Sequence, residues 1–164
     1  MCIRALFIFT AILVVSCATV GNAVRNLIDP REVDCLAKNL YFEARQESTA
    51  GKIAVGFVVF NRKYSKLFPD TVCEVIYQGR HNARGIPYLN RCQFSWYCDG
   101  RSDDPLNIDS FRDLTKLSEW LLFTERWMPD ITDGATYYHA LYVTPKWSFE
   151  KKRVMRIDNH IFYK

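Results

Sequence analysis

The sequence predicts an α+β fold in which helices come first along the chain and a small β-sheet comes late. The first observation is a helical repeat of apolar residues across residues 33–44. The second is that apolar and polar residues alternate only late in the chain, in ATYYHALYV and RVMRIDNHIFY. The 164 residues, 49% hydrophobic and 24% charged, suit one domain with its own core and exclude a disordered chain.

The first 23 residues have the pattern of an export signal. Arg4 precedes an apolar run from Ala5 to Val15, and small residues follow this run. The run is shorter than the roughly 18 apolar residues of a membrane-spanning helix, so a permanent anchor is disfavoured. We therefore expect residues 1–23 to be a signal peptide.

The end of this leader allows two processing outcomes. We favour soluble release by cleavage after Gly21-Asn22-Ala23, whereas VVSC, ending at Cys17, resembles a lipoprotein box in which that cysteine is lipidated. Residues 24–34 then form a short lead-in, and residues 35–164 form the folded domain. We expect a monomer exported to the periplasm or cell envelope, with a membrane association that is transient or mediated by the lipid.

Four cysteines follow the leader: Cys35, Cys73, Cys92 and Cys98. In an exported chain they predict two disulfides, and three pairings are open. Paired C-x-x-C spacing is missing and His139 and His160 are isolated, so we expect no metal and no other cofactor. The net charge of +4 is compatible with an acidic polymer as partner, and nucleic acid is not expected for an exported, nearly balanced chain.

The first helix is predicted to begin at Pro30. Asp29 can cap this helix, proline suits its first position, and Glu32 is placed to close a capping box with Asp29. The stripe that faces the core consists of Val33, Leu36, Ala37, Leu40, Tyr41 and Ala44. This spacing predicts a helix of about four turns.

The next segment, KIAVGFVVFNRKYS, is apolar almost all round from Ile53 to Phe60, so its periodicity fits a buried helix or a buried strand. Its length and polar tail favour a helix, opened by Ser48 or Thr49. Phe68-Pro69 then breaks the chain, and a short third helix follows, capped by Asp70 or Thr71 and ended by Gly79.

Residues 79–110 read as a long surface excursion around a short strand at CQFSW, which starts at Cys92. A fourth helix is predicted to start at Asp109 or Ser110 and to close before Pro129. Two strands follow Gly134, and the second folds back at Asp158-Asn159.

Glu43 is the candidate catalytic residue. It lies three residues after Leu40 and seven after Leu36, beside the apolar stripe of the first helix. A carboxyl group held partly out of water has a raised pKa, as a general acid near neutral pH requires. Such a glutamate at the end of a helix, facing a cleft, suits the cleavage of a glycosidic bond.

Four blocks of sequence in order resemble the SleB-type cell wall hydrolase family, which includes the spore cortex-lytic enzymes and many proteobacterial and phage relatives. These blocks are CLAKNLYFEARQESTAGKIAVGFVVFNRKYSKLFPDTVCEVIYQ from Cys35, CQFSWYCDG from Cys92, GATYYHALYVTPKW from Gly134 and RIDNHIFY from Arg156. The resemblance covers about residues 35 to 163, and therefore most of the chain after the leader.

The resemblance implies a lysozyme-like α+β fold that acts on peptidoglycan glycan strands, as a lytic transglycosylase in the best-understood members. It places the catalytic glutamate of the family's N/Y-x-E-A-R-G-E segment at Glu43, and it implies a helix for the second element. Two positions depart from the family pattern: Gln46 stands where glycine is usual, and Tyr137 replaces a frequent histidine. Neither removes the proton donor.

We expect a sugar-binding groove beside Glu43, because aromatic faces stack on pyranose rings and amide or hydroxyl groups bind N-acetyl groups. Its expected substrate-binding residues are Glu47, Gln93, Phe94, Ser95, Trp96, Tyr138 and His139. Phe94 and Trp96 also suit the core, Phe94 more so than Trp96. Glu47 also suits a structural role, as a cap for the following helix.

Two other functions fit the same sequence. One is a muramidase, in which Glu47 or Asp99 assists a water molecule and the glycan is hydrolysed. The other is a secreted, disulfide-linked module that binds the cell wall without cutting it.

Overall fold

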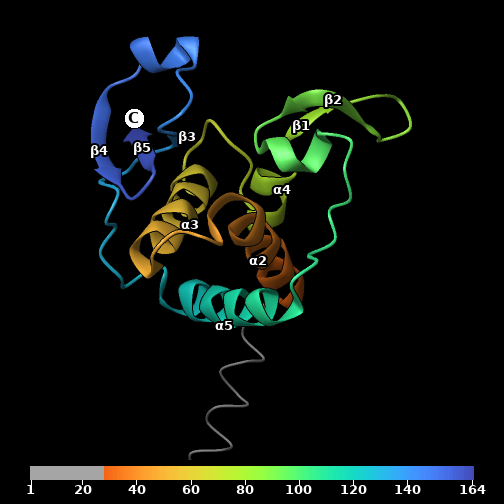
Figure 1. Ribbon diagram of the computed structural model, residues 1–164, viewed down its shortest axis with the longest axis horizontal. Coiled ribbons are helices and arrows are strands. Elements are labelled where there is room, and N and C mark those ends of the chain that lie inside the picture. Colours follow the sequence, from red (N-terminus) through yellow and green to blue (C-terminus); the bar gives the residue numbers. More distant parts are fainter. Residues whose placement is uncertain (1–27) are drawn as a thin grey trace, which may run out of the picture.

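The computed structural model describes residues 28–164, and the predicted signal peptide and lipidation site lie outside them. Four helices form the body: α2 (Pro30–Ala44), α3 (Thr49–Lys63), α4 (Val72–Ile76) and α5 (Ile108–Thr124). Two small antiparallel sheets stand on the same side of this body, with α5 on the opposite side (Figure 1). The predicted α+β class is therefore confirmed.

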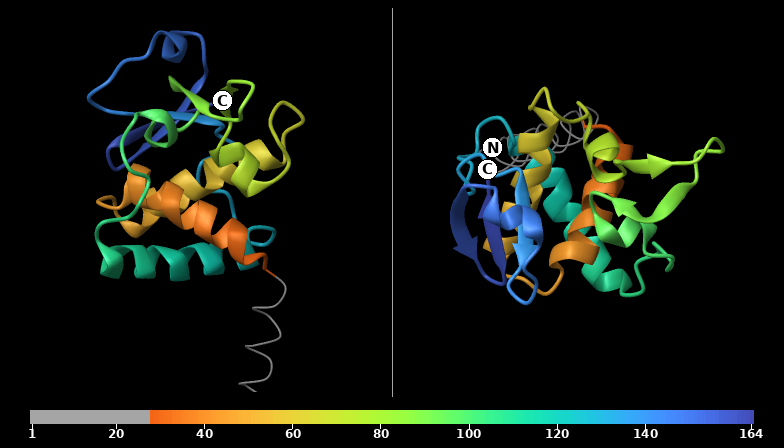
Figure 2. Two further views of the ribbon diagram at one scale, coloured as in Figure 1. Left: turned by 90° about the vertical axis from the view of Figure 1, so that its right-hand side faces the viewer. Right: turned by 90° about the horizontal axis from the view of Figure 1, so that it is seen from above.

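The first sheet is a hairpin of β1 (Gly79–His81) and β2 (Pro87–Cys92), followed by a 3₁₀ turn, η1 (Ser95–Cys98). The second sheet has the order β3-β5-β4. It comprises β3 (Tyr137–Ala140), β4 (Arg153–Ile157) and β5 (His160–Tyr163), with η2 (Lys146–Phe149) between β3 and β4. Both sheets lie above the helices in Figure 1, but the view from above shows them well apart, one over each flank of the helical body (Figure 2, right).

Helix α2 begins as predicted, with the Asp29 carboxylate accepting a hydrogen bond from the Arg31 backbone N–H at 2.9 Å. The predicted capping box between Glu32 and Asp29 is wrong. Glu32 instead accepts hydrogen bonds from the backbone N–H groups of Val72 (2.7 Å) and Cys73 (3.2 Å), at the start of α4. The first N–H groups of a helix have no hydrogen-bond partner within that helix. At the start of α4 these groups bind the Glu32 carboxylate, which also favours the positive end of the helix dipole.

The second element is a helix, α3, capped by the Ser48 hydroxyl, which accepts from Gly51 N–H at 3.2 Å. It is apolar all round because two different layers cover it. Phe60 and its neighbours pack into the helical core, while Ala54 and Val58 pack against Phe162 of the sheet. Burial on both faces removes the one-sided pattern from which a surface helix is recognised.

Helix α5 begins slightly earlier than predicted. Asn107 is its N-cap, and its side chain accepts a hydrogen bond from Ser110 N–H at 2.9 Å. The Tyr41 hydroxyl accepts from the Asn107 backbone N–H at 3.0 Å, so the start of α5 is tied to the end of α2. In the late sheet, β4 and β5 turn back at Asp158 as predicted.

The strand predicted at CQFSW is wrong, because β2 ends at Cys92 and Ser95 opens the 3₁₀ turn η1. A disulfide joins Cys92 to Cys98, with 6.1 Å between their Cα atoms. Six residues in a strand would separate those atoms by about 20 Å, so the cross-link requires a turn. The other disulfide joins Cys35 of α2 to Cys73 of α4, and the two-disulfide prediction is confirmed.

Candidate active site

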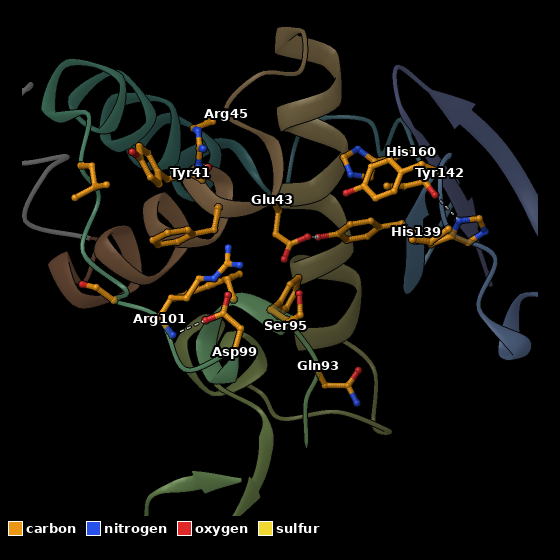
Figure 3. Close-up of a pocket in the computed structure, with 18 of the residues that line it drawn as sticks. Tyr41, Glu43, Arg45, Gln93, Ser95, Asp99, Arg101, His139, Tyr142 and His160 are labelled. Carbon is orange, nitrogen blue, oxygen red and sulfur yellow. Dashed lines mark hydrogen bonds between the residues drawn. The ribbon is translucent and has the colours of Figure 1, made fainter. Parts of the chain in front are cut away.

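Glu43 lies in the last turn of α2, and its side chain points into a cavity of about 830 Å³. The cavity lies between η1 with its flanking loop and the edge of the late sheet. The Tyr138 hydroxyl of β3 donates a hydrogen bond to Glu43 Oε2 at 2.9 Å, so strand and helix meet at the carboxyl group (Figure 3). The described chain therefore places Glu43 in a cleft, as expected.

Burial raises the pKa of Glu43 above its ordinary value, and this is the largest influence on the carboxyl group. The hydrogen bond from Tyr138 and the positive charge of Arg62 act in the opposite direction, without cancelling the effect. Burial and the neighbouring Glu43 also raise the pKa of Tyr138 well above its usual value, so this phenol remains a hydrogen-bond donor. A raised pKa is one of the properties that a general acid needs near neutral pH.

Arg62, in the last turn of α3, also lines the cavity. It is not among the site residues expected from the sequence. Its side chain is only 4% exposed. Its Nε donates a hydrogen bond to the Thr136 carbonyl at 2.8 Å. In the sequence, Arg62 belongs to the polar tail that follows the apolar run from Ile53 to Phe60, and that tail gave no sign of burial.

Four of the expected groove residues come from the segment that follows β2. Gln93 and Ser95 are exposed and line the cavity. Phe94 (3% exposed) and Trp96 (6% exposed) also border the cavity, but most of each ring lies in the core. The Trp96 indole stacks on Phe42, with ring centroids 4.8 Å apart. The two polar side chains are thus free for a ligand, and the two rings support the wall behind them.

Trp96 is held in place by a buried hydrogen bond: its indole Nε1 donates to Asn39 Oδ1 of α2 at 3.0 Å. Asn39 lies one helical turn before Glu43 and is fully buried. This contact joins the η1 wall to the helix that carries the acid. The position of Glu43 relative to Gln93 and Ser95 therefore depends on packing within the core.

His139 of β3 lines the cavity, and both of its ring nitrogens have partners. Nε2 lies 2.9 Å from the Tyr163 hydroxyl, and Nδ1 lies 3.0 Å from the Ala140 carbonyl. His160 was not among the expected site residues, but it borders the cavity and packs edge-on against Tyr138, with centroids 5.1 Å apart. Burial lowers the pKa of His160, so its ring is held towards the neutral form.

Glu47 does not line the main cavity. It borders a smaller adjoining one of about 550 Å³, which Glu43 and His160 also line. Its carboxylate accepts hydrogen bonds from the Asn159 backbone N–H and side-chain amide, both at 3.2 Å to the nearer oxygen. The predicted capping role belongs to Ser48, supported by Asp158, whose Oδ2 accepts from the Ser48 hydroxyl at 2.6 Å.

The wall opposite the sheet carries two exposed charged side chains, Asp99 and Arg101, which follow η1 (Figure 3). The Arg101 backbone N–H donates to Asp99 Oδ1 at 2.8 Å, which holds this turn together. Tyr137, which replaces the family's frequent histidine, does not line the cavity. Its ring packs near Trp147, with centroids 5.6 Å apart.

Among residues 28–164, no group of three or more histidine, cysteine or acidic side chains is arranged to hold a metal ion. Within the same part of the chain, no helix combines the length and the apolar character needed to cross a membrane.

Comparison with known proteins places this architecture among bacterial wall-lytic enzymes. The chain superposes on the catalytic domain of the germination-specific lytic transglycosylase SleB from Bacillus anthracis with a TM-score of 0.60 and 27% identity, covering 84% of this chain and 97% of that domain. The catalytic domain of the Bacillus cereus SleB protein gives a TM-score of 0.57, 27% identity, and coverage of 84% and 92%.

Related sequences agree with this likeness. A spore cortex-lytic enzyme from Bacillus cereus is 28% identical over 146 residues, which are 88% of this chain and 48% of the relative. One from Oceanobacillus iheyensis is 30% identical over 136 residues, or 81% of this chain and 41% of the relative. The chain thus spans about half the length, or less, of the curated relatives that it matches.

The sequence pattern of the family described as Cell Wall Hydrolase matches residues 46–163. This span includes both sheets, η1 and α3 to α5, and it begins three residues after Glu43. The superposed catalytic domains agree with that match. We conclude that the chain belongs to the cell wall hydrolase family, a family of enzymes.

Proposed function

We propose that this protein cleaves the glycan strands of peptidoglycan, as a lytic transglycosylase with Glu43 as its general acid and base. The observation that carries the proposal is the environment of Glu43: a partly buried carboxyl group with a raised pKa, facing a cavity large enough for sugar rings. The structural relative from Bacillus anthracis is a lytic transglycosylase, which supports the reaction class.

In the proposed reaction, protonated Glu43 gives its proton to the oxygen that bridges N-acetylmuramic acid and N-acetylglucosamine. The bond between C1 of the muramic acid and that oxygen breaks. The C6 hydroxyl of the same muramic acid attacks C1, and its proton passes to the Glu43 carboxylate. The product is a 1,6-anhydro sugar, and the acid is restored.

This route needs one carboxyl group, because the substrate supplies its own nucleophile. The other acids on the cavity wall, Asp99 and Asp104, are exposed, and Glu47 is hydrogen-bonded to Asn159 outside the main cavity. A single partly buried acid in the main cavity therefore agrees better with internal attack than with a pair of carboxyl groups.

The side chains around Glu43 have distinct proposed tasks. Tyr138 orients the carboxyl group through its hydrogen bond. Gln93 and Ser95 bind the N-acetyl or hydroxyl groups of the sugar, while Phe94 and Trp96 form the apolar part of the floor. His139 supports β3 through Tyr163 and contributes to the same wall.

The test is digestion of purified sacculi with the oxidised protein, followed by mass analysis of the released glycan ends. The Glu43→Gln variant removes the proton and is expected to lower the rate by at least about 10²-fold, the scale of general acid catalysis. Glu119→Gln on α5 is the matched control, because Glu119 lines neither of the two cavities that Glu43 borders. This variant is expected to digest sacculi at an unchanged rate.

Each outcome has a definite meaning. Anhydro ends, lost in the Glu43→Gln variant, support the transglycosylase. Reducing ends mean a muramidase, and a rate loss in Asp99→Asn would then identify the second acid. An inert but folded protein that still sediments with sacculi would indicate a binding module. A Glu43→Gln variant as active as the unaltered protein would refute the role of Glu43.

A further inference from the structure

The guanidinium of Arg62 is buried in the wall of the cavity without a carboxylate partner. Its Nε is bonded to the Thr136 carbonyl, and it forms no ion pair with any acid of residues 28–164. Its Nη1 is buried and has no hydrogen-bond partner. Burying a charge without a counter-ion costs free energy of folding, so such a charge is seldom kept for stability alone.

The charge is held in place by aromatic rings as well as by its hydrogen bond. Its guanidinium carbon lies 5.3 Å from the ring centroid of Phe68, 5.1 Å from that of Phe94 and 5.7 Å from that of Tyr137. These contacts come from three separate segments of the chain. They restrict the side chain to one orientation, in which it borders the same cavity as Glu43.

Glu43 is a carboxylic acid that lines the same cavity as this charge. The electrostatic influences on Arg62 come from Tyr138, Tyr137 and Glu43, and of these only Glu43 titrates as a carboxyl group. In return, Arg62 lowers the pKa of Glu43, against the larger effect of burial. The two groups thus border one cavity and influence each other's charge, although no ion pair joins them.

We propose, resting on the function proposed above, that Arg62 is a positioning residue that supplies the counter-charge for the Glu43 carboxylate formed when its proton is transferred. With Glu43 protonated, the site contains an unbalanced positive charge. Once the proton has left, the carboxylate and the guanidinium balance each other. The site therefore stabilises the state after proton transfer more than the state before it, which lowers the barrier.

The same arrangement explains why the acid can act twice. Burial alone would leave Glu43 too weak an acid to release its proton readily, whereas Arg62 and Tyr138 counteract that effect. A group that must first donate and then accept a proton works best when neither form is strongly favoured. Arg62 thus counteracts part of the effect that burial has on the acidity of Glu43.

The first test measures Glu43 itself, so that it does not depend on activity. The side-chain carboxyl carbon of Glu43 is followed by NMR across pH, with its signal identified by its absence in the Glu43→Gln variant. In Arg62→Met the titration midpoint is expected at higher pH than in the unaltered protein. In Arg62→Lys, which keeps a positive charge, the midpoint is expected closer to that of the unaltered protein.

The second test is the rate of sacculus digestion across pH. Arg62→Met is expected to lower the maximal rate on the order of 100-fold, the scale of a lost preorganised charge. Its alkaline limb is expected to shift to higher pH, with partial recovery of both effects in Arg62→Lys. The control for loss of a positive charge is Arg112→Met, which removes an exposed arginine of α5 that lines neither cavity beside Glu43.

Because Arg62 also packs against Phe68, Phe94 and Tyr137, the methionine variant is checked by its melting temperature and circular dichroism. A folded Arg62→Met protein with an unmoved Glu43 midpoint would overturn the proposal. If Arg62→Met does not fold, Arg62→Gln and Arg62→Lys decide the question by the same midpoint. A shifted midpoint in a protein that cleaves no glycan would uphold the coupling and refute the proposed function instead.

Discussion

Replacing both Cys35 and Cys73 by alanine is expected to destabilise the protein by about 4 kcal/mol. The disulfide closes a loop with a sequence separation of 38 residues, between the start of α2 and the start of α4. For a loop of that length, the chain-entropy model gives about 4 kcal/mol at 25 °C. By the same reasoning, the Cys92–Cys98 bridge, with a separation of 6, contributes about 2 kcal/mol.

The larger bridge also fixes the helix that carries Glu43. Near this bridge, Glu32 binds the first N–H groups of α4, so α2 and α4 are joined by a covalent bond and by hydrogen bonds at neighbouring positions. Loss of the bridge leaves the hydrogen bonds in place. We therefore expect a less stable protein that still folds and remains active at low temperature.

The assay is thermal unfolding of the oxidised protein, followed by circular dichroism, with guanidinium titrations to obtain the free energy. For a domain of this size, a loss of about 4 kcal/mol lowers the melting temperature by about 10–20 °C. The Cys92→Ser/Cys98→Ser pair is the control and is expected to lower it by about half as much. Equal losses for the two pairs, or a Cys35→Ala/Cys73→Ala protein within about 3 °C of the unaltered one, would refute the loop-length argument.

Two further predictions concern the site and its support. Tyr138→Phe removes the hydrogen bond to Glu43, which raises the pKa of that carboxyl group, so the alkaline limb of the pH–rate profile moves to higher pH. The rate should fall about 10- to 100-fold, as for a bond worth about 1.5–3 kcal/mol, and an unmoved limb would contradict this. In Gly51→Ala the new Cβ would lie 2.8 Å from Glu47 Cβ and closer still to Asp158 Oδ2, which caps α3 through Ser48. We expect a loss of about 1–3 kcal/mol in chemical denaturation, and a variant as stable as the original would show that Asp158 and Glu47 yield freely.

Residues near one another in the sequence accounted for most of the fold. The predicted starts of α2 and α3 agree with the caps at Asp29 and Ser48, because a cap joins residues two or three apart. The turn at Asp158 between β4 and β5 could also be predicted, because a tight turn involves only neighbouring residues. Glu43 could be singled out because its neighbours on the helix are known once the helix is known.

Predictions failed where a distant segment provided the partner. Glu32 was assigned to its own helix, although the N–H groups of α4, about 40 residues away, bind it instead. The segment at Ser95 was assigned to a strand, because its local composition suits one. A cross-link to Cys92 and the packing of Trp96 against α2 impose the turn.

The sequence by itself determined the order of helices and strands, the number of disulfides and the candidate acid, since each depends on spacing along the chain. Only the tertiary structure decided which cysteines pair, that Arg62 faces the cavity, and that Tyr138 holds Glu43. Tyr138 is 95 residues from Glu43 along the chain, and Thr136, whose carbonyl binds Arg62, is 74 residues from Arg62. Contacts at such separations arise from packing around a shared core, and no local pattern specifies them.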